Sequence, residues 1–174
     1  AAMHRALLEL LQVKQFDQIA IKEITEQAGV SYPVFFRQFR DKEELLADVA
    51  TEQVRNLLSH TEAAFDANSE VSIDGLCWYV QDHRKLWQAL LTGGANAAMR
   101  AEFSRISREL MQDRPRYNPG LPLDLAEELV VNAIFDILTW WMRQPDDYPI
   151  DNIIKLLDTL VVRIYTRPLD IRLK

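Results

Sequence analysis

The stretch from Ile21 to Lys42 reads IKEITEQAGVSYPVFFRQFRDK and decides the fold of the N-terminal part of the chain. Its first third carries apolar residues at the spacing of one helix face. Gly29 follows, and glycine adopts the positive φ of a tight turn without strain. Ser31 is then placed to cap a second short helix. Two short helices joined by such a turn predict a helix-turn-helix, whose second helix enters the major groove of DNA.

The second helix of this motif is predicted to have an inward and an outward face. The inward residues, which pack on the first helix, are apolar: Val30, Phe35 and Phe39. The outward residues are Tyr32, Pro33, Val34, Arg37 and Gln38. The outward face is therefore the one expected to meet DNA.

A set of positions in and around this stretch follows a fixed order without gaps: Phe16-Asp17, Ile21, Ile24, Ala28-Gly29-Val30-Ser31, Phe35-Phe36, Phe39, Asp41-Lys42-Glu43 and Leu45-Leu46. In this order the chain resembles the DNA-binding segment of the tetracycline-repressor (TetR) family. The resemblance implies an all-α dimeric transcriptional regulator with about nine helices. It implies a three-helix head at residues 1–48, joined by a long helix to a larger domain at residues 49–174 that binds a ligand and dimerises.

The resemblance and the outward face of the second helix together predict which residues of the head contact DNA: Lys22, Ser31, Tyr32, Pro33, Val34, Arg37, Gln38 and Lys42. Lys22 and Lys42 match positions that touch phosphate, and a helix N-terminus assists Lys42. Tyr32 and Pro33 match positions that approach bases.

Arg37 and Gln38 can read base edges, the arginine through a guanine and the glutamine through an adenine. Two departures from the family remove hydroxyl donors, since Val34 replaces a usual Thr and Phe36 a usual Tyr. Val34 can still touch a thymine methyl. Ala20 replaces the usual capping Ser or Thr, a loss of about 1 kcal/mol.

The charge of the head argues for weak DNA binding. The whole chain of 174 residues carries a net charge of −6, and residues 1–50 hold six Lys or Arg against eight Asp or Glu. Because phosphate neutralisation supplies much of the affinity for DNA, the few cations would have to converge on one face.

Composition excludes several other classes of protein. Hydrophobic residues at 48% and charged residues at 26% are typical of a globular protein. No apolar run reaches the length of a membrane span and no signal peptide is recognised. The single Cys77 rules out an intrachain disulfide and favours a cytoplasmic location. His4, His60 and His83 are scattered and no glycine-rich phosphate loop occurs, so no catalytic residue, metal or cofactor is predicted.

The remaining helices are predicted from their apolar spacing. We expect a capping box of Asp41 and Glu44 to open a long helix through about Phe65. A second long helix is expected at residues 72–92, with His83 on its buried seam, and Asn96 is expected to cap the next helix. After a loop at residues 114–122, helices are expected at residues 124–143 and 150–166.

The last two of these helices have broad apolar faces. Two such antiparallel helices suit a four-helix interface around a two-fold axis, so a homodimer is predicted through residues 124–166. The alternative is that both are ordinary core helices of a monomer. Asn132 and Asp136 are either buried polar anchors or part of a solvent-facing line.

Aromatic and sulfur-containing residues gather in the C-terminal two-thirds of the chain. Pockets between the helices of a bundle are lined in this way, which predicts a largely apolar small-molecule effector. The predicted ligand-binding residues are Trp78, Tyr79, His83, Trp87, Met99, Phe103, Phe135 and Trp140. The alternative is that the same residues form plain core.

These observations predict a ligand-responsive repressor, not an enzyme, that binds a palindromic operator as a homodimer. Its two recognition helices would lie about 34 Å apart, and the effector would shift the long helix between head and body. Two alternatives remain: a regulator with little DNA binding of its own that acts through a protein partner, and a helical small-molecule-binding protein.

Overall fold

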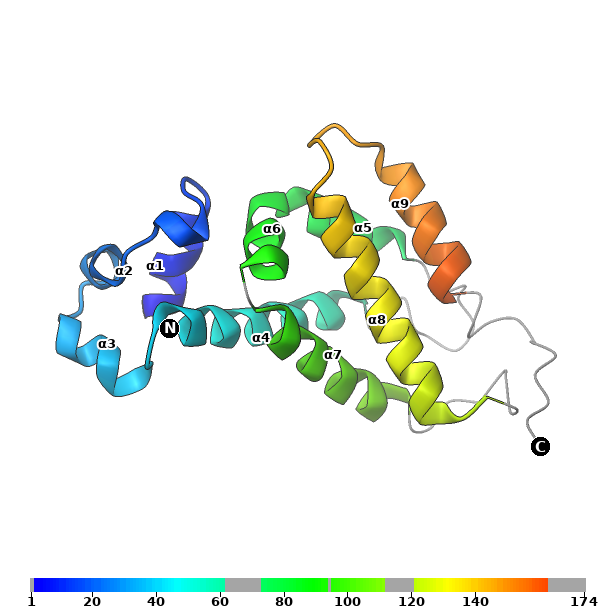
Figure 1. The fold of residues 1–174 in the computed structure, drawn as a ribbon, viewed down its shortest axis with the longest axis horizontal. Helices are drawn as coiled ribbons and strands as arrows, with labels where there is room; N and C mark the ends of the chain where they lie inside the picture. Colours follow the sequence, from blue (N-terminus) through cyan, green and yellow to red (C-terminus); the bar gives the residue numbers. More distant parts are fainter. Residues whose placement is uncertain (1, 62–72, 94, 112–120, 163–174) are drawn as a thin grey trace.

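The computed structural model describes residues 2–61, 73–93, 95–111 and 121–162, and within these ranges the protein is all helical (Figure 1). The described α-helices are α1 (Ala2–Leu11), α2 (Ile21–Ala28), α3 (Tyr32–Gln38), α4 (Lys42–Thr61), α5 (Asp74–Asp82), α6 (Arg84–Thr92), α7 (Asn96–Met111), α8 (Leu123–Met142) and α9 (Ile150–Leu157). A 3-10 turn, η1 (Phe16–Gln18), joins α1 to α2, and a wider π turn at Asp158–Val162 follows α9. The predicted fold class is confirmed.

Helices α1 to α3 form a head at one end of the molecule (Figure 1). Gly29 ends α2 with a φ of 66°, the left-handed conformation that the predicted turn requires. Ile24 and Phe35 are fully buried between the helices of the head. His4 of α1 ties the head to α4, because its Nε2 lies 2.9 Å from a carboxylate oxygen of Asp48 and its Nδ1 lies 2.7 Å from one of Glu52.

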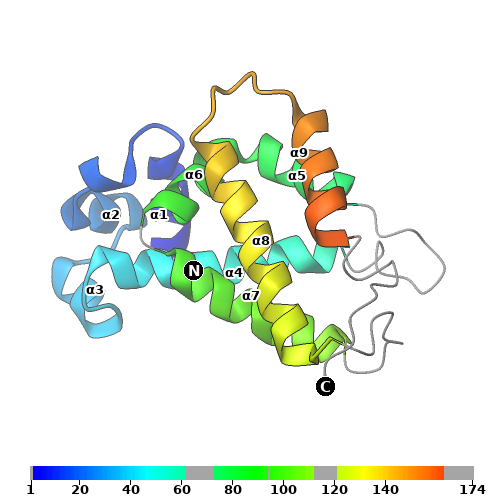
Figure 2. The same cartoon turned by 45° about the vertical axis from the view of Figure 1, so that its right-hand side comes forward.

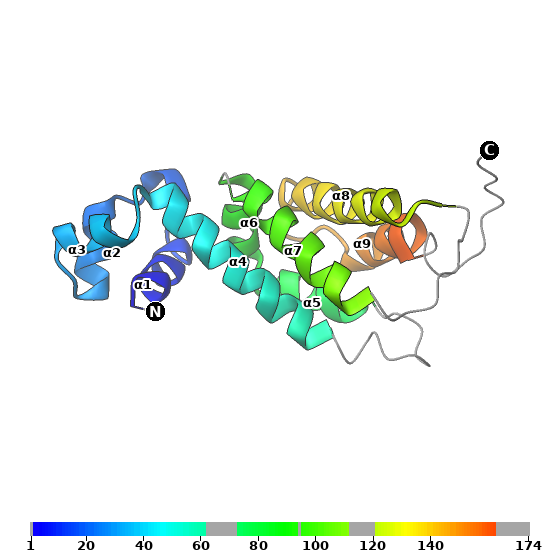
Figure 3. The same cartoon turned by 90° about the horizontal axis from the view of Figure 1, so that it is seen from below.

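Helix α4 runs from the head into the larger domain and lies along α7 (Figure 3). The predicted capping at its start is present in a shifted form: the Glu44 N–H donates to Asp41 Oδ1 at 2.8 Å, and the Arg40 N–H donates to Glu44 Oε2 at 2.6 Å. The predicted apolar stripe begins with Leu45 and Leu46, which are fully buried. The expected end of this helix at Phe65 lies outside the described residues.

The single helix predicted at residues 72–92 is wrong, because the chain breaks at His83 into α5 and α6 (Figure 2). His83 has φ −115° and ψ 31°, and its side chain is exposed and not on a buried seam. The break has a packing reason. It lets α5 bury Leu76 and Val80 beside α9, while α6 buries Trp87 and Leu90 beside α8.

Two predicted helix caps also differ from the structure. Asn96 is the first residue of α7, and its amide donates to Thr139 Oγ1 at 3.2 Å and to Leu91 O at 3.4 Å, so it joins α7 to α8 and does not cap a helix. Ser31 occupies the N-cap position of α3, but its hydroxyl makes no capping hydrogen bond.

Helices α8 and α9 lie side by side at the end remote from the head (Figures 1 and 2). Helix α8 begins and ends within one residue of the prediction. Helix α9 is regular only to Leu157, passes into the π turn, and its expected continuation to residue 166 lies outside the described residues. Of the two readings of Asn132 and Asp136, the solvent-facing one is confirmed, since both are exposed.

Candidate DNA interface and effector region

The outward face of α3 is largely apolar. Tyr32 and Phe36 are 50% and 47% exposed, and their rings meet edge to face at 5.1 Å between centroids. Pro33 and Arg37 are exposed on the same face of the helix. In Figure 1, α3 lies at the tip of the head, away from the larger domain. Nothing within the described structure therefore covers this face.

The other predicted residues of α3 are placed differently. Gln38 is exposed, but by helical spacing it lies on the opposite side of α3 from Tyr32. Val34 is half-buried, although it was expected to face outward. Its share of any DNA contact would be correspondingly small.

A shallow hollow lies beside the N-terminus of α3. It is lined by the segment from Asp17 to Lys22, by Tyr32 and by the segment from Asp41 to Glu43. The N-termini of α2 and α4 border it, and helix N-termini carry partial positive charge and unpaired N–H groups. These groups suit an anion such as a DNA phosphate, although the carboxylates of Asp17, Asp41 and Glu43, which also line the hollow, oppose one.

Few cations of the head are available to an incoming phosphate. Lys14 pairs with Glu23, and Arg40 Nε lies 2.8 Å from Asp41 Oδ2. Lys22 is 77% exposed and only loosely paired with Glu26, at 3.7 Å. Arg37 is exposed and makes no hydrogen bond or ion pair with any described residue. Lys22 and Arg37 are therefore the cations of α2 and α3 that can meet DNA.

The ammonium of Lys42 is turned into the protein. It donates to the carbonyl oxygens of Phe16, Asp17 and Ile19 at 3.0, 3.2 and 3.0 Å, and it lies 4.7 Å from the centroid of the Phe16 ring. An ammonium has three N–H donors, and all three are occupied here. In the structure this side chain holds η1 on the start of α4, and its contact to phosphate stays a prediction.

The cap that Ala20 cannot supply is partly replaced by Glu23. Its carboxylate accepts the Ala20 N–H at 3.0 Å and also pairs with Lys14. The backbone N–H of Ala20, followed by the Lys14 ammonium, lowers the pKa of Glu23 below its ordinary value. The start of α2 is thus fixed without the hydroxyl usual in the family. Because Lys14 pairs with Glu23 there, it is not available to bind phosphate.

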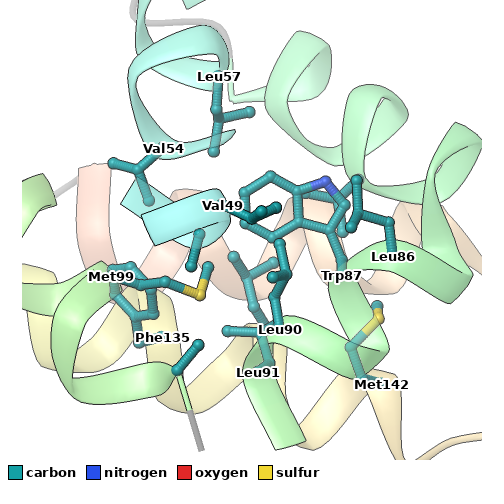
Figure 4. Close-up of a cluster of buried hydrophobic side chains, with 14 of the residues drawn as sticks. Val49, Val54, Leu57, Leu86, Trp87, Leu90, Leu91, Met99, Phe135 and Met142 are labelled. Carbon is teal, nitrogen blue, oxygen red and sulfur yellow. The ribbon is translucent and has the colours of Figure 1, made fainter. Parts of the chain in front are cut away.

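Four residues of the predicted ligand set are packed in the core: Trp87, Met99, Phe103 and Phe135. Figure 4 shows three of them, Trp87, Met99 and Phe135, in one cluster with Val49 and Val54 of α4. The rings of Phe103 and Phe135 meet edge to face at 5.6 Å. An apolar ligand here would have to enter between tightly packed side chains that touch α4.

The remaining predicted ligand residues do not join this cluster. Trp78, His83 and Trp140 are exposed, so the structure does not bring the predicted set together around one pocket. Tyr79 is half-buried beside His83, with ring centroids 4.6 Å apart, and burial raises the pKa of its hydroxyl. Trp140 instead packs edge to face on Tyr148.

Arg84 is a buried cation that the sequence did not reveal as important. Its Nη2 donates to the carbonyls of Trp141 and Gln144 at 3.0 and 2.7 Å, and its Nε donates to Asp146 Oδ1 at 2.8 Å. A guanidinium that donates to carbonyls in the last turn of α8 and just beyond it acts as a C-terminal cap. Only the tertiary fold brings these groups together, since they are far apart in sequence.

Two further networks fasten the helices of the larger domain. Glu102 of α7 accepts Arg55 Nε of α4 at 2.6 Å and Arg105 Nη2 at 2.8 Å, and these hydrogen bonds, that of Arg105 first, lower its pKa to about 2. Arg100 of α7 donates to Asn132 Oδ1 at 2.7 Å and to Asp136 Oδ1 at 2.6 Å on α8.

The described residues hold no group of His, Cys, Asp and Glu side chains suited to a metal ion. Among the described helices, none is both long and apolar enough to cross a bilayer.

Comparison with known proteins agrees with this architecture. Residues 5–49 match the model of the bacterial regulatory proteins of the tetR family. Over 92% of the chain, the fold resembles that of a TetR transcriptional regulator from Rhodococcus sp. RHA1, with a TM-score of 0.63 and 18% identity over 94% of that protein. A TetR transcriptional regulator from Streptococcus agalactiae 2603V gives a TM-score of 0.54 and 18% identity, covering 92% of each chain.

An uncharacterized HTH-type transcriptional regulator of Haemophilus influenzae is 24% identical over 125 residues, which are 67% of this chain and 61% of that relative. The chain thus spans about three-fifths of that relative's length. The head thus matches the model of the tetR-family regulatory proteins over residues 5–49, and the all-helical fold is shared with solved TetR transcriptional regulators.

Proposed function

We propose that the chain is a homodimeric repressor that binds a palindromic operator and is released by an apolar effector. The observation that carries the DNA part of this proposal is α3, whose outward face is uncovered at the tip of a helix-turn-helix head. Tyr32, Pro33 and Arg37 meet the bases, Lys22 meets phosphate, and Ser31, Val34 and Gln38 lie at the edges of the contact. Residues 1–48 form the DNA-binding unit, and residues 49–174 bind the effector and the second subunit.

The dimer is proposed through α8 and α9. Helix α8 and the π turn after α9 leave large apolar side chains exposed: Leu125, Leu129 and Trp140 on α8, and Leu160 in the turn. Monomeric proteins rarely expose several such residues together, and two antiparallel helices from each subunit form a four-helix interface around a two-fold axis. The polar residues Asn132 and Asp136 share the same exposed side of α8 and would lie at the interface.

The effector is proposed to bind in the core cluster around Trp87. The Nε1–H of this residue is buried and has no hydrogen-bond partner among the residues that the structure describes, which favours a ligand that is largely apolar and carries one acceptor. Val49 and Val54 of α4 belong to the same cluster, so an occupant would press on the helix that carries the head. The exposed residues Trp78, His83 and Trp140 are not needed for this site.

Helix α6 offers the effector a second path to the head. Lys85 at its start donates to the carbonyl of Gln12 in the head at 2.9 Å. At its end, a Cβ on Gly93 would clash with the Ala89 carbonyl oxygen, which requires a glycine, and would also lie 3.2 Å from Leu46 and 3.4 Å from Phe16 of the head. An effector beside Trp87 therefore acts on α6, which contacts the head at both of its ends. It shifts the head only if its affinity for the protein differs between the two positions of the head.

The test of this function combines sedimentation with footprinting. The full chain should sediment as a dimer and protect two half-sites about one helical turn apart in the DNA upstream of its own coding region. Leu129→Asp, which places a charge in the proposed interface, should give a folded monomer that has lost the paired footprint. Sedimentation of the unmodified chain as a monomer that still protects both half-sites would refute the proposed dimer.

The effector is tested by a thermal-shift screen of apolar compounds that carry one carbonyl acceptor. A hit should raise the unfolding temperature of the chain and weaken its operator complex. Trp87→Phe keeps most of the ring area but lacks the N–H, so it should bind the hit less tightly. Equal affinity of this variant would refute the assigned hydrogen bond.

A second candidate is a regulator that acts mainly through a protein partner. The pairing of Lys14, Arg40 and Lys42 within the head favours it, because these cations are withheld from phosphate. The absence of any footprint at 50 mM salt, with recovery of a second regulator on the immobilised chain but not on an Arg37→Glu variant, would favour this candidate over the first.

A further inference from the structure

The outward face of α3 carries two aromatic rings side by side. Tyr32 and Phe36 lie one helical turn apart, and each leaves about half of its surface exposed. Phe36 is held in place from below by the buried Phe35, whose ring centroid is 5.3 Å away and meets it edge to face. Pro33 is exposed next to Tyr32 and extends the same surface. The tip of the head is therefore a fixed apolar surface and not a set of mobile polar side chains.

This surface limits what α3 can read in a major groove. The base edges there present nitrogen and oxygen donors and acceptors, and one apolar group, the C5 methyl of thymine. Phe36 and Pro33 have no side-chain hydrogen-bonding group, so neither can pair with a polar base edge. On this face only the Tyr32 hydroxyl and the Arg37 guanidinium can do so.

We propose that α3 recognises its operator chiefly by packing Tyr32, Pro33 and Phe36 against thymine methyl groups, with Arg37 supplying a hydrogen bond to a guanine. This inference rests on the proposed function and specifies the DNA sequence class: half-sites with thymines at the positions facing these three residues. The absence of a hydroxyl at Val34 and Phe36, a loss in polar readout, is consistent with a surface adapted to methyl groups.

The position of this surface on the head favours DNA over a protein as its occupant. The surface is continuous with the hollow bordered by the N-termini of α2 and α4, in which Tyr32 is also a lining residue. Of the available cations, Lys22 lies on α2, which borders the hollow, and Arg37 lies on α3 itself. A protein partner would not require an apolar surface combined with helix N-termini suited to phosphate and with available cations.

The experiment begins with a randomised duplex library from which the purified full chain selects its preferred sequence. In the selected duplex, each dT of a half-site is replaced in turn by dU, which removes the methyl group and leaves every hydrogen-bonding group in place. Burial of one methyl changes affinity by about two- to fivefold, so each contacted thymine should show a loss of that size when replaced. Thymines outside the contact should show none.

Protein variants then assign the contacts. Phe36→Ala should weaken binding to the thymine duplex, but the loss caused by dU at its partner position should disappear, because the methyl no longer meets a ring. Tyr32→Ala should abolish the effect at a neighbouring position. Arg37→Ala is the matched control: it lowers affinity while every dU effect persists. If circular dichroism shows that Phe36→Ala does not fold, Phe36→Leu replaces it and should reduce the loss caused by dU. Tyr32→Ala still provides the comparison of dT and dU between variant and unmodified chain.

The outcomes separate the inference from the function beneath it. Enrichment of a sequence whose dU replacements all bind as well as dT would overturn the thymine inference alone. Losses on dU replacement that persist unchanged in both Phe36→Ala and Tyr32→Ala would also overturn it. A selection that enriches no sequence would overturn the inference together with direct DNA recognition, and would favour a protein on the α3 surface.

Discussion

Replacement of Lys42 by methionine tests whether this residue is structural or a phosphate contact. Lys42→Met keeps an unbranched side chain of similar length and removes the ammonium. The three carbonyls of Phe16, Asp17 and Ile19 then lose their shared donor, and the Phe16 ring loses the cation above it. We expect the head to lose stability before any effect on DNA is considered.

The expected size follows from these contacts. A hydrogen bond to a charged group contributes about 1.5–3 kcal/mol and an exposed cation–π contact about 0.5–1 kcal/mol. The carbonyl of Asp17 is exposed and can accept water instead, and one ammonium serves all three acceptors. The loss should therefore be about 2–4 kcal/mol, not the sum of the parts. For a chain of this length, each kcal/mol lowers the unfolding temperature by about 2–4 °C.

The measurement is urea and thermal unfolding followed by circular dichroism at one fixed protein concentration, because a dimer's stability depends on concentration. Lys22→Met is the matched control. The Lys22 side chain is 77% exposed and its ammonium lies 3.7 Å from a carboxylate oxygen of Glu26, so its loss should change stability by less than about 0.5 kcal/mol. A Lys42→Met protein as stable as the unmodified chain, but with weaker binding to every DNA, would refute this reasoning and restore the phosphate contact.

Other predictions concern the larger domain. Hydrogen bonds from Arg105 and Arg55 lower the folded-state pKa of Glu102 to about 2, so the stabilisation from its carboxylate is present above about pH 5 and is lost as pH falls toward 2. Glu102→Gln should therefore lower the free energy of unfolding by about 1–2 kcal/mol at pH 7. The difference in this free energy between the variant and the unmodified chain should vanish near pH 2. A constant difference across that range would contradict the assignment. Arg84→Met should lower the free energy of unfolding by about 2–4 kcal/mol in thermal unfolding, since the carbonyls of Trp141 and Gln144 at the end of α8 lose their donor. A loss below about 0.5 kcal/mol would count against the capping role of Arg84. Burial raises the pKa of Cys77 to about 12, so its thiol should resist iodoacetamide at pH 8 in the folded chain and react in urea, and rapid labelling of the folded chain would show the site to be open.

The head could be predicted from sequence because its determinants are local. Helical spacing, a glycine at the turn and a run of family positions all lie within residues 16–46, and Gly29 adopts the predicted left-handed conformation. The direction of the Lys42 side chain could not be predicted. A lysine at a helix start can point to solvent or back over the preceding turn, and only the position of η1 decides between them.

The break at His83 was missed for a related reason. The apolar period continues across it, since both α5 and α6 bury one face, and the segment from Leu76 to Leu91 contains no Gly or Pro to mark a break. What forces the break is tertiary: the two halves cover different helices, and Arg84 next to the break is held by the end of α8. Such contacts leave no trace in local periodicity.

The effector region shows the limit of composition as a guide. Aromatic residues were correctly expected in the larger domain, but composition does not distinguish Trp87, which is fully buried, from Trp78, which is half exposed. Nor could the sequence show that the indole N–H of Trp87 has no hydrogen-bond partner within the described parts of the chain. Both properties depend on how α5 and α6 diverge after His83.

The most direct test of the account is the salt dependence of operator affinity. Lys22 at phosphate and Arg37 at a guanine in the groove bring four positive charges per dimer close to the phosphates, and release of the counterions that they displace gives a slope of about −3 to −4 in a plot of log affinity against log salt. Affinity should then fall about 100-fold between 50 and 200 mM, and Arg37→Ala should reduce the slope to about −2. Absence of a specific complex at 50 mM salt, or a slope unchanged in both Arg37→Ala and Lys22→Met, would contradict the claim that this chain regulates transcription by binding DNA through α3.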